Sequence, residues 1–221
     1  MPVVFDAHHQ TVRGCWAPDD ARLHEHASKK HLRRMETTVA WLDLKRDLQT
    51  LDLDAQLQAI EEEGGPELAR RRGETRSLRG LQRCLRGDVE GGFAEWEEAA
   101  AELPTLGLPH FFRGRWLMDS DPAEALIHLD RAAVVEPRDP NVYWRRGDCH
   151  ARLGDHERAL ANYHRALTLD PESIDGLVAL GSTLTSLGRP DEALRYYDQA
   201  ITLAPRYVDF HAARAIAHEV L

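Results

Sequence analysis

The feature that most constrains this sequence is a stretch written twice, at a period of 34 residues. "RRGDCHARLGDHERALANYHRALTLDP" runs from Arg145 to Pro171, and "ALGSTLTSLGRPDEALRYYDQAITLAP" runs from Ala179 to Pro205. A fixed period of this size indicates stacked supersecondary units, because one such unit cannot bury its apolar face alone. The equivalent residues are Gly147 and Gly181, Gly154 and Gly188, Ala159 and Ala193, Tyr163 and Tyr197, Ala166 and Ala200, and Pro171 and Pro205.

Two weaker copies precede these stretches. The copy nearer to Arg145 shares four positions with the copy that follows it, at the same period of 34 residues. The earlier copy does not keep one spacing to the next copy, because the spacing changes by one residue between its two helices. The recurring glycine and proline register argues against an unrelated helical bundle. The positions that carry the weaker copies are Ala125, Leu129, Ala132 and Pro137, and before them Gly80, Gly87, Gly92, Trp96, Ala99 and Pro104.

Each unit is predicted to consist of two helices. In the unit after Pro140, we expect a first helix over residues 141–153 and a second helix that ends at Leu169. Gly154 breaks the first helix, and Asp155 is a suitable N-cap for the second.

Small residues in this unit predict close helix packing. Gly147, Ala159 and Ala166 leave room for the two backbones to approach each other. Tyr163 and Leu167 are then expected to fill the space between one unit and the next.

This pattern resembles the tetratricopeptide repeat (TPR), on Gly147, Ala159, Tyr163, Ala166 and Pro171 and their equivalents one period later. The resemblance implies an all-α fold, an α-solenoid of about four helix-turn-helix units with an N-terminal helical cap and a C-terminal capping helix. We expect an N-terminal tail and cap over 1–65 and a repeat domain over 66–221. The expected units are about 73–104, 107–137, 141–171 and 175–205, with the capping helix over 206–221.

The N-terminal region carries a cluster of histidines near Cys15. Histidine and cysteine can together bind zinc, but residues two apart on a helix point about 200° apart, and the sequence has no zinc-motif spacing. We therefore predict no metal site and no cofactor, with a metal-dependent enzyme built on these histidines as a remote alternative. The histidines are His8, His9, His24, His26 and His31.

Composition and missing motifs exclude several functions. The net charge of −9 argues against nucleic acid as a partner, and no apolar run approaches the ~20 residues of a membrane span. With no signal peptide and three scattered cysteines, Cys15, Cys84 and Cys149, we expect a cytoplasmic protein. Nucleotide-binding and nucleophile motifs are absent, so we predict no catalytic residues and no enzyme activity.

One predicted helix is crowded with arginines, and carboxylates follow it in the next helix, at Glu90, Glu95, Glu97, Glu98 and Glu102. Two hypotheses stay open. The two helices neutralise each other, or the arginines form an anion-binding end of a groove. The arginines are Arg70, Arg71, Arg72, Arg76, Arg79, Arg83 and Arg86.

The resemblance implies that the first helix of each unit lines a concave groove. Phe111 and Trp144 are expected there as exposed aromatics that bind a partner, unless the N-terminal segment or the C-terminal helix covers them. The predicted partner-binding residues are Phe111, Arg115, Asn141, Trp144, Asp148, Asp175, Val178 and Ser182.

Some TPR proteins hold the C-terminal carboxylate of a chaperone with a clamp of lysine, asparagine and arginine. Trp144 and Asp148 stand at the corresponding positions here, so the resemblance disfavours that role. The predicted function is a non-catalytic scaffold that binds a protein or peptide, with an arginine of the partner meeting Asp148 or Asp175. The alternative is a structural homo-oligomer that assembles through its repeats.

Overall fold

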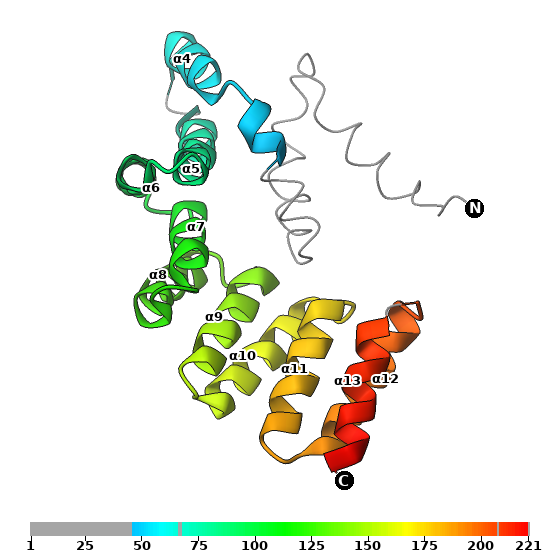
Figure 1. The fold of residues 1–221 in the computed structure, drawn as a ribbon. Helices are drawn as coiled ribbons and strands as arrows, with labels where there is room; N and C mark the ends of the chain where they lie inside the picture. The colour runs from blue at the N-terminus through cyan, green and yellow to red at the C-terminus, as the bar shows by residue number, and fades with distance from the viewer. Residues whose placement is uncertain (1–45, 66–67, 207, 221) are drawn as a thin grey trace, which may run out of the picture.

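The computed structural model describes residues 46–65, 68–206 and 208–220, and the regular structure in these residues is helical (Figure 1). Residues 46–50 form a short helical segment. The helices expected before residue 46 lie outside the described residues. The helices that follow are α4 (Leu53–Glu63), α5 (Ala69–Leu85), α6 (Val89–Glu102), α7 (Leu108–Leu117), α8 (Pro122–Val135), α9 (Pro140–Arg152), α10 (His156–Leu169), α11 (Ile174–Ser186), α12 (Pro190–Leu203) and α13 (Val208–Val220).

The helices pack in chain order as successive pairs, α5 with α6, α7 with α8, α9 with α10 and α11 with α12. The first helices of neighbouring pairs also contact one another, as α5 does with α7 and α9 does with α11. The stack therefore curves, with α6 and α8 on its outer side and α5 and α7 on its inner side (Figure 1). The predicted all-α solenoid is confirmed. None of the described helices is long and apolar enough to cross a membrane.

The turns inside the pairs follow the predicted chemistry. Asp155 caps α10, because its carboxylate accepts the backbone N–H of Arg158 at 3.2 Å. Asp88 and Asp121 cap α6 and α8 in the same way. Gly154 lies directly before Asp155 and has a φ of 77°, a left-handed conformation that favours glycine.

Glycine allows the two helices of a pair to meet. A Cβ on Gly147 would collide with the Tyr163 ring, and one on Gly181 would lie 2.8 Å from the Tyr197 ring. Tyr163 therefore packs against the first helix of its own unit, a contact that its predicted place between units did not include, and it shares a buried cluster with Leu180 and Leu184 of the next unit. Leu167 does reach the next unit, where its Cδ2 would lie 3.2 Å from a Cβ on Gly176.

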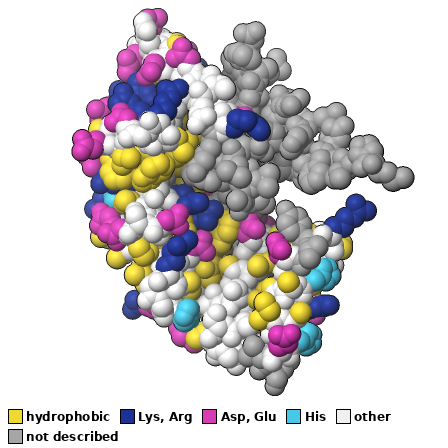
Figure 2. Space-filling view, viewed as in Figure 1, with side chains coloured by type: hydrophobic (Ala, Val, Ile, Leu, Met, Phe, Trp, Pro, Cys, Tyr) yellow, Lys and Arg dark blue, Asp and Glu magenta, His cyan; other side chains and the backbone are white. Residues whose placement is uncertain are grey.

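The arginines of α5 are neutralised by carboxylates on both neighbouring helices. Arg79 contacts Asp54 of α4 at 2.9 Å and Glu95 of α6 at 2.8 Å. Figure 2 shows this end of the molecule with blue arginines flanked by magenta carboxylates. The hypothesis of mutual neutralisation is confirmed and extends to α4. The other pairs are Arg70 with Glu74, Arg71 with Glu63, Arg72 with Glu102, Arg76 with Glu61, Glu98 and Glu102, and Arg83 with Asp88 and Glu95.

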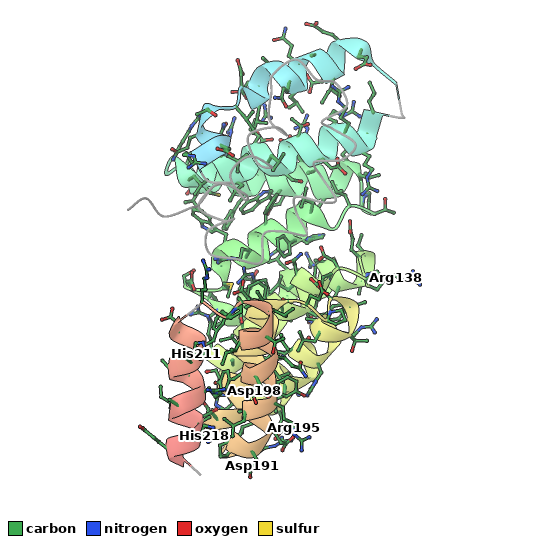
Figure 3. All side chains as sticks on the ribbon, turned by 90° about the vertical axis from the view of Figure 1, so that its right-hand side faces the viewer. Arg138, Asp191, Arg195, Asp198, His211 and His218 are labelled. Atoms are coloured by element: carbon green, nitrogen blue, oxygen red, sulfur yellow. The ribbon has the colours of Figure 1, made fainter. Side chains whose placement is uncertain are left out.

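The last helix continues the stack. α13 packs against α12 and along α11, and it buries its own Phe210 and Ala217 in these contacts. Arg214 contacts Asp198 of α12 at 3.0 Å, and Figure 3 shows Asp198 on α12 beside α13, which carries His211 and His218.

Candidate partner-binding groove

The predicted groove residues lie on three consecutive first helices. Residues spaced three, four or seven apart along a helix share one face. α9 contacts α11, and the ion pair of Arg152 with Asp119 joins α9 to the end of α7. The residues are Phe111 and Arg115 on α7, Asn141, Trp144 and Asp148 on α9, and Asp175, Val178 and Ser182 on α11.

Both predicted aromatics are buried. Phe111 is 7% exposed and Trp144 is 9% exposed, so the expectation of an exposed aromatic patch is wrong. Phe111 packs against Phe112 with ring centroids 5.9 Å apart. The guanidinium of Arg145 lies 4.1 Å from the centroid of the Trp144 ring, a cation–π contact that covers part of the indole. The N-terminal segment that was one candidate cover lies outside the described residues.

Asp148 is engaged within its own unit. Its carboxylate accepts a hydrogen bond of 2.9 Å from the Tyr163 hydroxyl and one of 3.1 Å from Arg145. Burial raises the pKa of Asp148, and the two donors counter that rise. The side chain thus joins α9 to α10, and its charge is compensated before any partner arrives.

A row of charges crosses from α7 to α9 on the same face. Arg152 contacts Asp119 at 2.7 Å, and Arg115 lies 3.9 Å from the same carboxylate. Burial, followed by the nearby charge of Arg145, lowers the pKa of Arg115 to about 10. Sequence reasoning missed Arg145 and Arg152, although their spacing of seven residues places them on one helix face.

Two buried polar atoms in this groove have no hydrogen-bond partner. They are the indole Nε1 of Trp144 and Oδ2 of Asp175. Burial raises the pKa of Asp175 to about 6, Arg145 partly opposes that rise, and Asp148 adds to it. An unmet donor on α9 and an unmet acceptor on α11 therefore lie on one inner face.

The remaining predicted residues differ in exposure. Ser182 is exposed and Val178 is half-buried. Asn141 is buried, and both its backbone N–H and its side-chain amide donate to Asp139 Oδ1, at 2.9 Å and 3.1 Å. Asn141 therefore helps to hold the start of α9.

A hollow of about 390 Å³ lies at one edge of this face, where α5, α7 and α9 begin. Its apolar wall includes Leu106, Phe111 and Val142, and its rim includes Arg70 and Arg138. Phe111 thus lines this edge of the stack. Sequence reasoning missed the hollow because loops from two different turns form it.

The N-terminal histidines, whose metal binding was the remote alternative, lie outside the described residues. Within residues 46–65, 68–206 and 208–220, no group of three or more His, Cys, Asp or Glu side chains could hold a metal ion. Cys84 and Cys149 are buried among apolar side chains of the core. Burial raises their thiol pKa to about 11 and about 12, so neither is a reactive thiolate.

Residues 138–206 match the family model of the tetratricopeptide repeat. A search of curated proteins found no match. A crystal structure of MamA superposes with a TM-score of 0.59 at 21% identity, over 63% of this chain and 82% of that one.

Two further structures are similar. TTC0263, a thermophilic TPR protein in Thermus thermophilus, has a TM-score of 0.55 at 24% identity, over 76% of this chain and 91% of that one. The first TPR of Spaghetti (RPAP3), bound to the HSP90 peptide SRMEEVD, has a TM-score of 0.50 at 17% identity, over 51% and 90%. At such identities the likeness shows the fold alone.

Proposed function

Residues 138–206 of this chain belong to the tetratricopeptide-repeat family, and from this premise we propose that the chain is a non-catalytic scaffold. Its partner is a protein or peptide segment bound along the inner face of α7, α9 and α11. Proteins built from stacked helix pairs generally use the concave surface in this way. The cytoplasmic location stays a prediction.

The observation that carries the proposal is the pair of unmet polar atoms, Trp144 Nε1 and Asp175 Oδ2. Leaving a buried donor or acceptor without a partner costs about 1–3 kcal/mol. A polypeptide segment supplies what both atoms lack, because a backbone carbonyl accepts from the indole and an N–H group donates to the carboxylate. Binding would thus satisfy groups that the free chain leaves unpaired.

The charge of the groove favours a basic partner residue. Burial raises the pKa of Asp175, and the nearby charge of Asp148 adds to that rise, so the surroundings of this carboxyl group under-compensate its negative charge. Asp148 is already held by Tyr163 and Arg145, which leaves Asp175 as the acceptor for a partner's arginine or lysine. The similar structure named above holds a peptide with two adjacent glutamates, and we propose the opposite charge preference here.

Selection from a random peptide library on the immobilised chain tests the proposal. Peptides that contain an arginine or lysine beside apolar residues should be enriched. They should bind Asp175→Asn and Trp144→Phe more weakly than the unchanged chain and should bind Asp191→Asn equally well. Asp191 is exposed on α12 and serves as the control (Figure 3). Failure to enrich any peptide, or equal binding to all three variants, would count against a groove at this position.

Two alternatives have their own tests. Light scattering at two concentrations decides between the scaffold and a structural homo-oligomer, because a strict monomer at high concentration removes the oligomer. Metal analysis of the purified chain decides on the N-terminal histidines, because a chain without bound zinc or iron removes the metal-dependent enzyme.

A further inference from the structure

A second hollow lies on the outer side of the stack, between α6, α7 and α8, on the face opposite the proposed groove. Its volume is about 460 Å³. Figure 2 shows blue, magenta and cyan side chains together at this outer edge. The chemistry-bearing residues of its wall are Glu97, His110, Arg113, His128 and Arg131.

His128 is buried in this wall with unmet hydrogen-bonding capacity. Its side chain is 7% exposed, and neither ring nitrogen has a hydrogen-bond partner. Nε2 lies 3.4 Å from Glu124 Oε1, an ion-pair distance when the ring is protonated. The His110 ring stacks on the His128 ring with centroids 6.0 Å apart. Nε of Arg113 is a further buried donor without a partner in the same wall.

The charges that face the two imidazoles come from all three helices. α6 supplies Glu97, which contacts Arg113 of α7 at 2.7 Å. α8 supplies Glu124 and Arg131, and within the described residues no ion pair or ring contact engages Arg131. Two guanidinium groups and two carboxylates balance each other, so protonation of the histidines decides the net charge of the hollow.

Burial first, and nearby positive charges second, lower the pKa of both histidines. Burial is the largest cause that lowers the pKa of His110, and His128, Arg131 and Arg113 lower it further. Burial also lowers the pKa of His128, where Arg113 and Arg131 add to the effect and Glu124 opposes it. An anion placed among these donors would reverse the electrostatic part of both shifts.

The equivalent surface one unit along, on α9 and α10, differs at the histidine positions. Gly114 packs against Leu129 as Gly147 packs against Tyr163, which fixes the equivalence of the two units. The same two arginines recur as Arg146 and Arg165, but Tyr143 and Asn162 replace the two histidines.

On that neighbouring surface both arginines contact one aromatic ring. The guanidinium groups of Arg146 and Arg165 lie 5.8 Å and 5.5 Å from the centroid of the Tyr143 ring. Arg146 also contacts Asp130 at 2.8 Å. Arg113 is engaged in the same way, since it contacts Glu97 at 2.7 Å and lies 4.6 Å from the centroid of the Phe93 ring. The two units therefore differ at Arg131, which no ion pair or ring contact engages within the described residues, and at the two histidines.

We propose that the hollow between α6, α7 and α8 binds a phosphate group, either free phosphate or a small phosphate monoester, through Arg113, Arg131 and the protonated His110 and His128. A phosphate accepts several charge-assisted hydrogen bonds at once, and the guanidinium fork matches its oxygens. A protonated imidazole has two donors and no acceptor, so the anion meets every unmet atom of this wall.

Binding and protonation must be linked. If phosphate raises the pKa of the imidazoles, then protonation of the imidazoles raises the affinity for phosphate by the same factor. Phosphate itself loses its second proton near neutral pH, at about pH 6 for a monoester, so affinities must be compared for the same ionised form of the ligand. For that form, affinity should rise as the pH falls through the range in which these histidines titrate, and the carboxylates of Glu97 and Glu124 should weaken binding above that range.

Calorimetric titration of the full chain with inorganic phosphate at about pH 6 and about pH 7.5, at constant ionic strength, tests the site. We expect saturable binding at the lower pH and at least about tenfold weaker binding at the higher pH. Methyl phosphate in a second arm distinguishes a monoester ligand, which should bind more tightly, from free phosphate. Acetate should bind more weakly than either, and equal binding of acetate would overturn the phosphate assignment.

Three variants locate the site, with folding checked by circular dichroism. Arg131→Gln alters an exposed side chain and should weaken phosphate binding at least about tenfold. Arg165→Gln is the matched control at the equivalent position of the next unit and should leave binding unchanged. His128→Asn introduces the residue that stands at the equivalent position, Asn162, and should reduce the pH dependence. Absence of saturable binding, equal losses in both arginine variants, or pH-independent binding would overturn the proposal, and none of these outcomes depends on the inner groove.

Discussion

The hydroxyl group of Tyr163 donates a hydrogen bond of 2.9 Å to Asp148 across the two helices of one unit. This contact makes Asp148 part of the internal structure, although its position on the inner helix suggests a partner contact. It also raises the pKa of Tyr163, with burial as the larger cause. The tyrosine that marks the repeat thus has two roles, since its ring fills the space over Gly147 and its hydroxyl holds a buried charge.

Tyr163→Phe should therefore destabilise the chain by about 1–3 kcal/mol, because it removes one of the donors to a buried carboxylate. The matched control is Tyr197→Phe one unit later, where the hydroxyl meets the neutral Thr185. We expect that variant to lose only about 0.5–1.5 kcal/mol. Urea unfolding of both variants checks the difference, and equal losses would show that the charge of Asp148 is unimportant.

Gly147→Ala should destabilise the chain by about 1–3 kcal/mol, because the new methyl group collides with the Tyr163 ring. Alanine is otherwise the better helix former by about 1 kcal/mol, so a stabilised variant would show that the helices separate readily. Ser182→Ala, at an exposed position of α11, is the control and should change the stability by less than about 0.5 kcal/mol. Thermal unfolding of both variants gives the comparison.

Asp175→Asn should stabilise the chain in a pH-dependent way. The pKa of Asp175 is raised to about 6 in the folded chain, so the stability from its neutral form is present at low pH and is lost as the pH rises through about 6. The free energy of unfolding should be about 1 kcal/mol higher in the variant at neutral pH. The gain is no larger because Asp175 is partly exposed and because a negative charge in the first turn of α11 is favourable. The gain should vanish near pH 4. Unfolding midpoints across this range check the prediction, and a gain that grows towards low pH would contradict it.

Arg79→Met should destabilise the chain by about 2–3 kcal/mol, because it leaves Glu95, whose side chain is 7% exposed, with only the longer contact to Arg83 at 3.6 Å. Arg70→Met removes an exposed pair within α5 and should cost less than about 0.5 kcal/mol. Equal losses of stability in urea unfolding would mean that the ion pair of Arg79 with Glu95 stabilises the chain no more than an exposed pair does.

Turn chemistry was predictable from the sequence because it is local. Gly154 and Asp155 act through their own backbone and the next turn, so their roles as helix stop and N-cap follow from residue type and order. The pairing of α5 arginines with α6 carboxylates was predictable for the same reason, since consecutive helices of a unit must pack together.

The burial of the groove aromatics was not predictable, because helical spacing fixes a face and not what covers it. Arg145 is adjacent to Trp144 in the chain, yet its long side chain folds over the indole ring. The stacked histidines were also missed. His110 and His128 lie on different helices, and the one-residue slip in α7 hides their equivalence to Tyr143 and Asn162.

The central claim is that the inner face around Trp144 and Asp175 binds a polypeptide segment, and titration calorimetry with a peptide selected on the unchanged chain tests it most directly. Loss of a charge-assisted hydrogen bond in Asp175→Asn should weaken binding about tenfold or more, and loss of the indole N–H in Trp144→Phe should weaken it about three- to tenfold. Both variants should keep their helical content. Unchanged affinity in both variants would contradict the account.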